Sequence, residues 1–332
     1  MYQINLDTQE RPLDGRQLDR LIDAWLTATA AGVTPTTLAG YRQKIDHFRR
    51  WWTEHAAAND YQITKRNLAA FGAWLAQQPS RNPPHKPIGY GQQADVLRRL
   101  SQMFRWAKER NYTEIDHGDW LPAPRGEPTK RRAPTIEDLR RLMDAAAESA
   151  TPIRDRAILA FLIGTGARRA EAASLRIEAI QFAADGSGTA EVAGKRTRAN
   201  KSGRHAVAFD REAGAYLIAY LDADGRTAGP LFVGRGSTGI GVQSIYRVVK
   251  RAISRGGLEG RIGATHDLRR AFATHLARHA HSDPAIAADL IRRQLGQASY
   301  RTTAEIYTLL DAEDIRAAMV SPLGIMRASD TA

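Results

Sequence analysis

The feature that constrains this chain most is the helical pattern in residues 265–309, near its end. Apolar side chains recur there every four positions, at Leu268, Phe272 and Leu276. This spacing predicts an amphipathic helix, and His266 and Arg269 project from one side of it because they stand nearly one helical turn apart. A guanidinium donates paired hydrogen bonds to a phosphate or carboxylate, and a histidine beside it can move a proton. The pair predicts an anion site, although a surface helix without a ligand also explains it.

A second helix is expected directly after the first. Asp283 and Pro284 fit the N-cap and the first helical position, and the apolar pattern continues to Leu295 before Gly296. Gln297 follows, then a Thr-Thr pair at 302–303 and an Ile-Tyr pair at 306–307. In this order the residues resemble the C-terminal signature of the tyrosine recombinase (phage integrase) family, which runs His-x-Leu-Arg, Leu-Gly-His, Thr-Thr and Ile-Tyr.

A further block, residues 164–175, contains two glycines after an apolar run. A dinucleotide-binding loop is excluded because Arg169 replaces the third glycine, and because the preceding run is expected to be an amphipathic helix instead of a short strand. The block resembles the first arginine box of the same family, with Arg168 in the place of the catalytic arginine. In that resemblance Glu171, one turn further, holds the geometry of the site.

The resemblance implies a catalytic set of Arg168, Lys195, His266, Arg269, Gln297 and the nucleophile Tyr307. Tyr307 attacks a DNA phosphodiester and forms a 3′-phosphotyrosyl bond, while Arg168 and Arg269 hold the non-bridging oxygens. Lys195 protonates the leaving oxygen and His266 assists proton movement at the tyrosine. The covalent bond conserves the energy of the broken one, so neither a cofactor nor magnesium is implied.

Two departures from the family pattern stand out. Gln297 occupies a position where the family has His or Trp, and one additional residue precedes the Ile-Tyr pair. A glutamine amide cannot titrate near neutral pH but can donate a hydrogen bond, as an indole does. Tyr307 is expected to be the nucleophile instead of Tyr300, which follows the Leu-Gly-Gln segment too closely. These departures keep open a DNA-binding protein that does not cleave.

A formal charge of +12 and a pI near 10.1 indicate a polyanionic partner, with nucleic acid first and an anionic membrane surface second. The chain has no cysteine, which excludes disulfides and thiolate metal sites. The spacing of His275, His279 and His281 suits zinc, but no further ligands accompany them and a metal is not expected. Without an apolar run long enough to span a bilayer or a signal-peptide pattern, a soluble cytoplasmic protein is expected.

Residues 1–120 show four helical patterns and are expected to form an all-helical, DNA-binding bundle. Its candidate phosphate contacts are Arg42, Lys44, Arg98, Arg99 and Arg105. These residues are equally well explained as solvated helix faces. A basic, proline-rich linker is expected at 121–134, with Lys130, Arg131 and Arg132 as further DNA contacts or as a solubilised hinge.

The catalytic domain is expected at 135–332, opening with a helix capped by Thr135. Alternating runs at 189–193 and 205–209 predict an antiparallel hairpin with a basic tip. The family carries a catalytic lysine on such a hairpin. Lys195 fits the end of the first strand best, and Lys201 remains an alternative because the loop is long.

The expected fold is mainly α-helical with a small antiparallel β-sheet in the catalytic domain, arranged as a two-domain C-shaped clamp on DNA. The expected function is site-specific DNA recombination. A type IB topoisomerase and an inactive architectural protein are the alternatives. Double-stranded DNA is the expected partner, together with a tetramer on two duplexes and accessory DNA-bending proteins. The apolar tail 311–326 is expected to dock on a neighbouring protomer.

Overall fold

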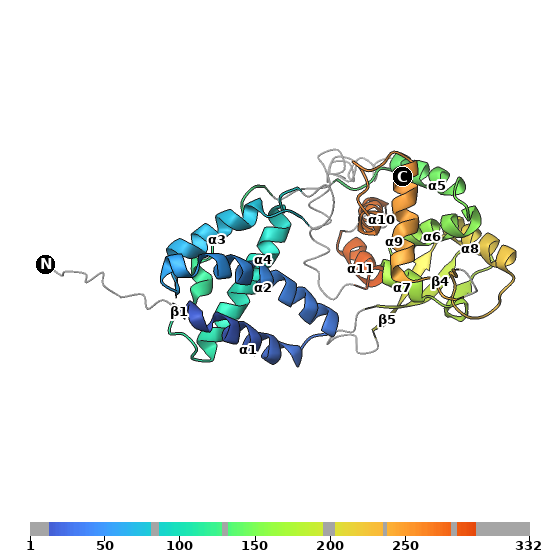
Figure 1. Cartoon of the computed structure of the whole chain (residues 1–332). Coiled ribbons are helices and arrows are strands. Elements are labelled where there is room, and N and C mark those ends of the chain that lie inside the picture. The colour runs from blue at the N-terminus through green and yellow to red at the C-terminus, as the bar shows by residue number, and fades with distance from the viewer. Residues whose placement is uncertain are drawn as a thin grey trace, which may run out of the picture. The chain divides into compact units, whose positions relative to one another are not determined.

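The computed structural model describes residues 13–80, 86–127, 132–194, 203–234, 238–279 and 284–296. The chain separates into two compact units, Met1–Lys130 and Arg131–Ala332 (Figure 1). The mainly α-helical fold with a small antiparallel sheet is confirmed. The C-shaped arrangement of the two units stays a prediction.

The described part of the N-terminal unit is built on four helices, as expected: α1 (Leu18–Ala30), α2 (Pro35–His55), α3 (Lys65–Gln77) and α4 (Tyr90–Glu109). The same residues include three short 3₁₀ helices, η1 (Gly15–Gln17), η2 (Ala57–Asn59) and η3 (His117–Trp120). The all-helical expectation was incomplete, because β1 (Leu13–Asp14) pairs antiparallel with β2 (Gln62–Ile63). Two-residue strands are too short to show an alternating pattern in the sequence.

Two helices of this unit, α2 and α3, begin at side-chain caps. Thr34 accepts a hydrogen bond from the backbone N–H of Thr37 at 3.3 Å, with Pro35 at the first helical position. Thr64 and Asn67 form a reciprocal capping box at the start of α3. The core between the helices is aromatic, and the rings of Trp51, Trp52, Phe71 and Phe104 surround Phe48.

The unit continues beyond the expected boundary at residue 120. Trp120 and Leu121 pack against its core, and the backbone N–H of Arg125 donates to Gln93 Oε1 at 2.9 Å. The first part of the expected linker is therefore attached to the helical bundle.

The C-terminal unit contains seven helices among its described residues: α5 (Ile136–Ala147), α6 (Pro152–Thr165), α7 (Arg169–Ser174), α8 (Arg211–Asp224), α9 (Val242–Arg255), α10 (Thr265–His279) and α11 (Pro284–Gln294), with the short 3₁₀ helix η4 (Ile177–Ala179). The helix α6 lies at the centre, in contact with α5, α8, α9 and α10 (Figure 1). Residues 157–162 of α6 are all buried. The expected helix is confirmed, but its amphipathic interpretation was wrong because this helix is covered on all sides.

The small sheet has the strand order β3 (Ile180–Phe182), β4 (Gly188–Ala193) and β5 (Arg204–Phe209), with antiparallel pairing throughout. The expected hairpin is confirmed as β4 and β5, whereas β3 and the helix α8 were not identified from the sequence. Alternation places Ala190, Val192, Val207 and Phe209 in the core. No helix among the described residues is long and apolar enough to cross a membrane.

Candidate active site

A left-handed turn begins the candidate site at the end of α6. Gly166 has φ +65°, and a Cβ at this position would lie 2.6 Å from the ring of Phe272 and 2.7 Å from Leu295. Glycine is required on both counts, since other residues avoid this backbone conformation and no space remains for a side chain. The turn brings Arg168 directly beside α10 and α11.

Arg168 is held by Glu171 through two hydrogen bonds. Its backbone N–H donates to Glu171 Oε2 at 2.6 Å, and its Nη1 donates to Glu171 Oε1 at 2.7 Å. The carboxylate is 1% exposed, so the paired guanidinium offsets the cost of burying it. The side chain of Arg168 remains 42% exposed, which leaves its other donors accessible.

Arg269, on α10, is 6% exposed, and among the described residues its guanidinium donates to backbone carbonyls. Its Nη1 donates to Gly166 O at 2.8 Å, and its Nη2 donates to Leu295 O at 2.6 Å. Burial, together with the charge of Arg168, lowers the pKa of Arg269 to about 10. It is therefore positively charged at neutral pH.

The two arginines meet at one carbonyl oxygen. Leu295 O accepts from Arg269 at 2.6 Å and from Arg168 Nη1 at 3.4 Å. Hydrogen bonds of the two arginines thus join three segments that are distant in the sequence: the Gly166 turn, α10 and the end of α11. The two positive charges lie close together at this point. Like charges are costly to bring together unless a further anion joins them, so the arrangement is suited to binding a phosphate.

Gln294, which the sequence analysis missed, fixes the end of α11 against the sheet. Its side-chain amide donates to Ala208 O at 2.7 Å and to Thr165 O at 3.2 Å, and its Oε1 accepts from the N–H of Ala208 at 2.9 Å. The amide thus continues the hydrogen-bond ladder at the edge of β5. No pattern in the sequence signals this role, because the partner strand is distant along the chain.

His266 is an exposed residue in the first turn of α10, next to the buried Asp267 and Leu268. Partial loss of water around the ring, followed by the charges of Arg270 and Arg269, lowers its pKa. The neighbouring Asp267 caps the segment before the helix, accepting the N–H of Gly263 at 2.7 Å. His266 is therefore neutral at neutral pH and able to accept a proton.

Several expected site residues lie outside the described residues, namely Lys195, Lys201, Gln297, Tyr300, Tyr307 and the tail 311–326. The structure does describe Gly194 and Gly296, which directly precede Lys195 and Gln297. A Cβ at Gly194 would lie 3.3 Å from Glu171 Oε1, and Gly296 directly follows the carbonyl shared by the two arginines. Among the described residues, no group of His, Asp or Glu is arranged to hold a metal ion.

The five expected phosphate contacts of the N-terminal unit differ in their surroundings. Lys44 and Arg98 both pair with Asp95, and Arg105 lies 3.6 Å from Asp116 Oδ2. Arg99 lies over the ring of Tyr41, 4.3 Å from its centre. Arg42 is exposed and has no acidic partner among the described residues. Arg132 is also exposed, whereas Lys130 and Arg131 lie outside the described residues.

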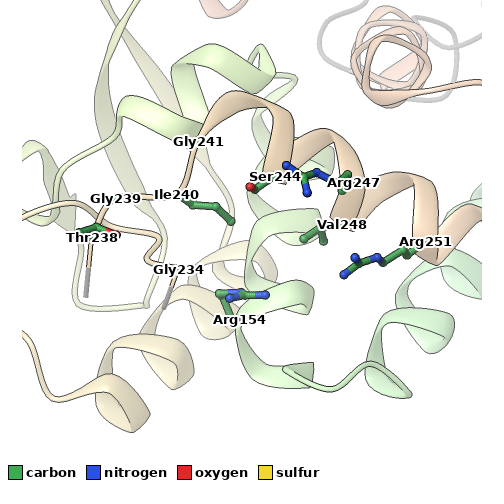
Figure 2. A pocket seen from close by; sticks show the side chains of 10 residues that line it. All are labelled: Arg154, Gly234, Thr238, Gly239, Ile240, Gly241, Ser244, Arg247, Val248 and Arg251. Carbon is green, nitrogen blue, oxygen red and sulfur yellow. The ribbon is translucent and has the colours of Figure 1, made fainter. Parts of the chain in front are cut away.

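A basic pocket of about 530 Å³ was not expected from the sequence (Figure 2). It is lined by Arg154, Arg247 and Arg251, together with Ser244 and the loop before α9. Arg154 is paired with Asp155 at 2.9 Å. Arg247 and Arg251 have no acidic partner among the described residues, which makes this surface attractive to anions. None of the three expected catalytic residues that the structure describes, Arg168, His266 and Arg269, lines it.

Comparison with known proteins identifies the class to which this fold and site belong. Residues 135–314 match the phage integrase family. The chain is 29% identical over 320 residues to tyrosine recombinase XerC 2 of Ralstonia nicotianae, covering 92% of this chain and 86% of that protein. It is 29% identical to tyrosine recombinase XerD of Corynebacterium glutamicum, covering 89% of this chain and 95% of that protein.

Solved structures show the same fold. A lambda integrase dimer bound to a COC′ core site superposes with a TM-score of 0.64 at 18% identity, covering 87% of this chain and 76% of that one. XerH bound to its difH substrate gives 0.62 at 20% identity, covering 90% and 82%.

The family match covers more than half of the sequence, so this chain belongs to the phage integrase family. It is a tyrosine recombinase, an enzyme that exchanges DNA strands in site-specific recombination.

Proposed function

We propose that the chain cuts and rejoins DNA through a 3′-phosphotyrosyl intermediate, with Tyr307 as the nucleophile. The tyrosine oxygen attacks phosphorus, the bond from phosphorus to the 5′ oxygen breaks, and the leaving 5′ oxygen takes a proton. Reversal by a 5′-hydroxyl from another strand completes the exchange. The observation that carries the proposal is the convergence of Arg168 and Arg269 on Leu295 O.

In this proposal the arginine pair binds the non-bridging oxygens of the scissile phosphate. A planar guanidinium keeps donors in a fixed fork, and both side chains are already positioned before DNA arrives. Arg269 is buried and Arg168 is anchored by Glu171, so little reorganisation accompanies binding. Gln297 adds one donor to the same oxygens.

Proton transfer is assigned to Lys195 and His266. Lys195 protonates the leaving oxygen, and Lys201 remains the alternative for that role. A neutral His266 accepts the proton of the attacking tyrosine, and the lowered pKa of its ring supports this role.

DNA is bound by both units in this proposal. Arg42 is the candidate phosphate contact in the N-terminal unit with the fewest competing partners. Lys130, Arg131 and Arg132 are candidate contacts within the expected linker. The pocket of Arg154, Arg247 and Arg251 provides a further phosphate-binding surface on the C-terminal unit. A lambda integrase dimer of the same fold has been solved bound to a COC′ core site, which supports DNA as the partner.

Self-association through the tail 311–326 is the proposed basis of a tetramer on two duplexes. A lambda integrase tetramer bound to a Holliday junction has the same fold, with a TM-score of 0.66. A groove of about 280 Å³ between α5, α6 and α8 is lined by Ile136, Leu139, Met143, Ile163 and Tyr216, among others. It provides an apolar surface for a tail of matching character from another copy. Accessory DNA-bending proteins remain an expectation.

The test begins with a pool of randomised duplexes from which the full chain selects its binding sequence. The selected duplex is then rebuilt with a nick beside the cleavage position, so that a released fragment diffuses away and traps any covalent adduct. We expect a denaturation-resistant protein–DNA adduct, and rejoining when a fresh 5′-hydroxyl strand is supplied. Tight binding with neither adduct nor rejoining would contradict the proposal and favour the inactive DNA-binding protein.

A further inference from the structure

A half-buried imidazole outside the expected catalytic set lies near the arginine pair. His205 is on β5, opposite Val192 in the register of the hairpin. Its strand alternation places it on the inner face with Val207 and Phe209, at the end of that row. Its Nε2 is shielded from solvent and has no hydrogen-bond partner among the described residues. Buried polar atoms without partners are rare in folded proteins, so this position calls for an explanation.

The ring is in close contact with two glycines. A Cβ at Gly296 would lie 2.7 Å from both Cε1 and Nε2 of His205, and a Cβ at Gly194 would lie 3.3 Å from Cε1 and Nδ1. The imidazole therefore occupies the space between the end of the hairpin and the turn after α11. Gly296 also has φ +55°, a conformation that favours glycine.

We propose that His205 is a positioning residue whose ring sets the place of the Leu295 carbonyl, and through it the two arginines. Gly296 lies close enough to the imidazole that an added Cβ would meet the ring, and the carbonyl oxygen of the preceding Leu295 accepts from both Arg269 and Arg168. A displacement of Gly296 is thus transmitted to both guanidiniums in a single step. The inference rests on the proposed function, because the arginine pair is its target.

Burial is the main factor that favours the neutral form of the ring and lowers the pKa of His205. Glu171 attracts a proton to the ring, whereas Arg168 and Arg269 oppose one. A neutral ring spaces the glycines without adding a third positive charge to the arginine pair. This role differs from catalysis, since the ring acts through the backbone and not on the substrate.

The main test compares His205→Ala, Gly296→Ala and the double variant in single-turnover cleavage of the nicked, selected duplex. We expect His205→Ala to bind this DNA as tightly as the parent but to cleave it about a hundredfold more slowly, as displaced catalytic groups do. Gly296→Ala should be slower still because its Cβ meets the ring. In the double variant the ring is absent, and cleavage should be faster than in Gly296→Ala alone.

Gly225→Ala is the matched control for backbone strain. Gly225 has φ +72°, but a Cβ there would meet no atom within 4 Å. It should cleave at the parental rate. Parental cleavage by His205→Ala, or a double variant as slow as the product of the single effects, would overturn the role of His205 while leaving the proposed function intact.

A second measurement does not depend on cleavage. In the DNA-free full chain, the side-chain Nε–Hε NMR resonances of Arg168 and Arg269 should shift in His205→Ala and stay in place in Gly225→Ala. Unchanged arginine resonances in His205→Ala would overturn the inference even if the parent formed no adduct. An absent adduct in the parent would instead contradict the proposed function alone.

Discussion

The two units differ in the kinds of side chain that they bury in their cores. All six tryptophans of the chain lie in its first 120 residues, and the core of the N-terminal unit combines aliphatic side chains with large rings packed around Phe48. Its buried polar residues are Asn67, Gln93 and His117, and no Asp, Glu, Lys or Arg is buried among its described residues. This unit is therefore stabilised mainly by the burial of apolar side chains.

The C-terminal unit has an aliphatic core but buries several charges, among them Glu171, Asp267 and Arg269. Burying a charge is unfavourable unless partners are supplied. Glu171 and Asp267 find theirs within four residues, at Arg168 and Gly263, whereas the partners of Arg269 come from segments far apart in the sequence. The second unit therefore gives up some stability in order to hold a charged site in place before DNA binds. The largest experimental effect is expected at this charged site.

Removing the buried arginine should have the largest effect. Arg269→Ala takes away a preorganised guanidinium, and we expect adduct formation on the nicked duplex to fall by about ten-thousandfold. The tryptophan-reported unfolding of the N-terminal unit should be unchanged. Arg140→Ala is the control, since Arg140 is exposed and pairs with Glu137 within one helix. Loss of cleavage in Arg140→Ala, or its retention in Arg269→Ala, would contradict the site.

Core truncations should separate the stabilities of the two units. Phe48→Ala should lower the unfolding free energy of the N-terminal unit by about 4 kcal/mol, since a large buried ring is removed. Tryptophan fluorescence during urea unfolding measures this unit alone. Phe161 lies in the fully buried centre of α6. Phe161→Ala should leave the fluorescence transition of the N-terminal unit in place and should lower the urea midpoint of the C-terminal unit, followed by circular dichroism. Equal shifts of both transitions in either variant would mean that the cores are not independent.

Acid should weaken the N-terminal unit through His117. Burial lowers its folded-state pKa from 6.5 to about 4. Between these values the unfolded chain binds a proton that the folded unit does not, so stability is complete above pH 6.5 and falls as the pH decreases. The expected loss is about 3 kcal/mol.

The measurement for His117 is the urea midpoint from tryptophan fluorescence across that pH window. His117→Gln cannot titrate and should show a flatter pH dependence, whatever its stability at neutral pH. A slope as steep as that of the parent would assign the effect to other groups.

The smallest effect is expected from Arg42→Ala. If Arg42 contacts one phosphate, its removal should reduce the slope of log affinity against log salt by about 0.9. Arg105→Ala is the comparison, since Arg105 already has Asp116 beside it and should change the slope less. Binding titrations of the selected duplex at several salt concentrations provide both values. A larger change for Arg105→Ala would contradict the assignment of Arg42.

The sequence predicted best what depends on local pattern. Helix starts at Thr64 and Thr135 were accessible because a cap and its partner lie three residues apart. The family signature directed attention to Arg168 and Arg269 because it keeps them in order along the chain. Their common acceptor, Leu295 O, could not be predicted, since a backbone carbonyl carries no sequence signal.

What was missed depends on contacts between distant segments. Gln294 is an ordinary residue at a helix end until β5 is placed beside it. His205 was visible as one position of an alternating strand, and the only available signal was a polar side chain on the face shared with Val207 and Phe209. The uniform burial of α6 also required knowledge of what surrounds it, because a helix pattern does not show how many neighbours cover it.

The most direct test of the account is to identify the residue that becomes linked to DNA. The parent adduct on the nicked duplex would be digested with protease and nuclease, and the peptide carrying the remaining nucleotide would be sequenced by mass spectrometry. The account predicts a phosphodiester link at Tyr307, an adduct for Tyr300→Phe, and none for Tyr307→Phe or Arg269→Ala. A link at Tyr300, or an adduct of undiminished yield in Arg269→Ala, would contradict it.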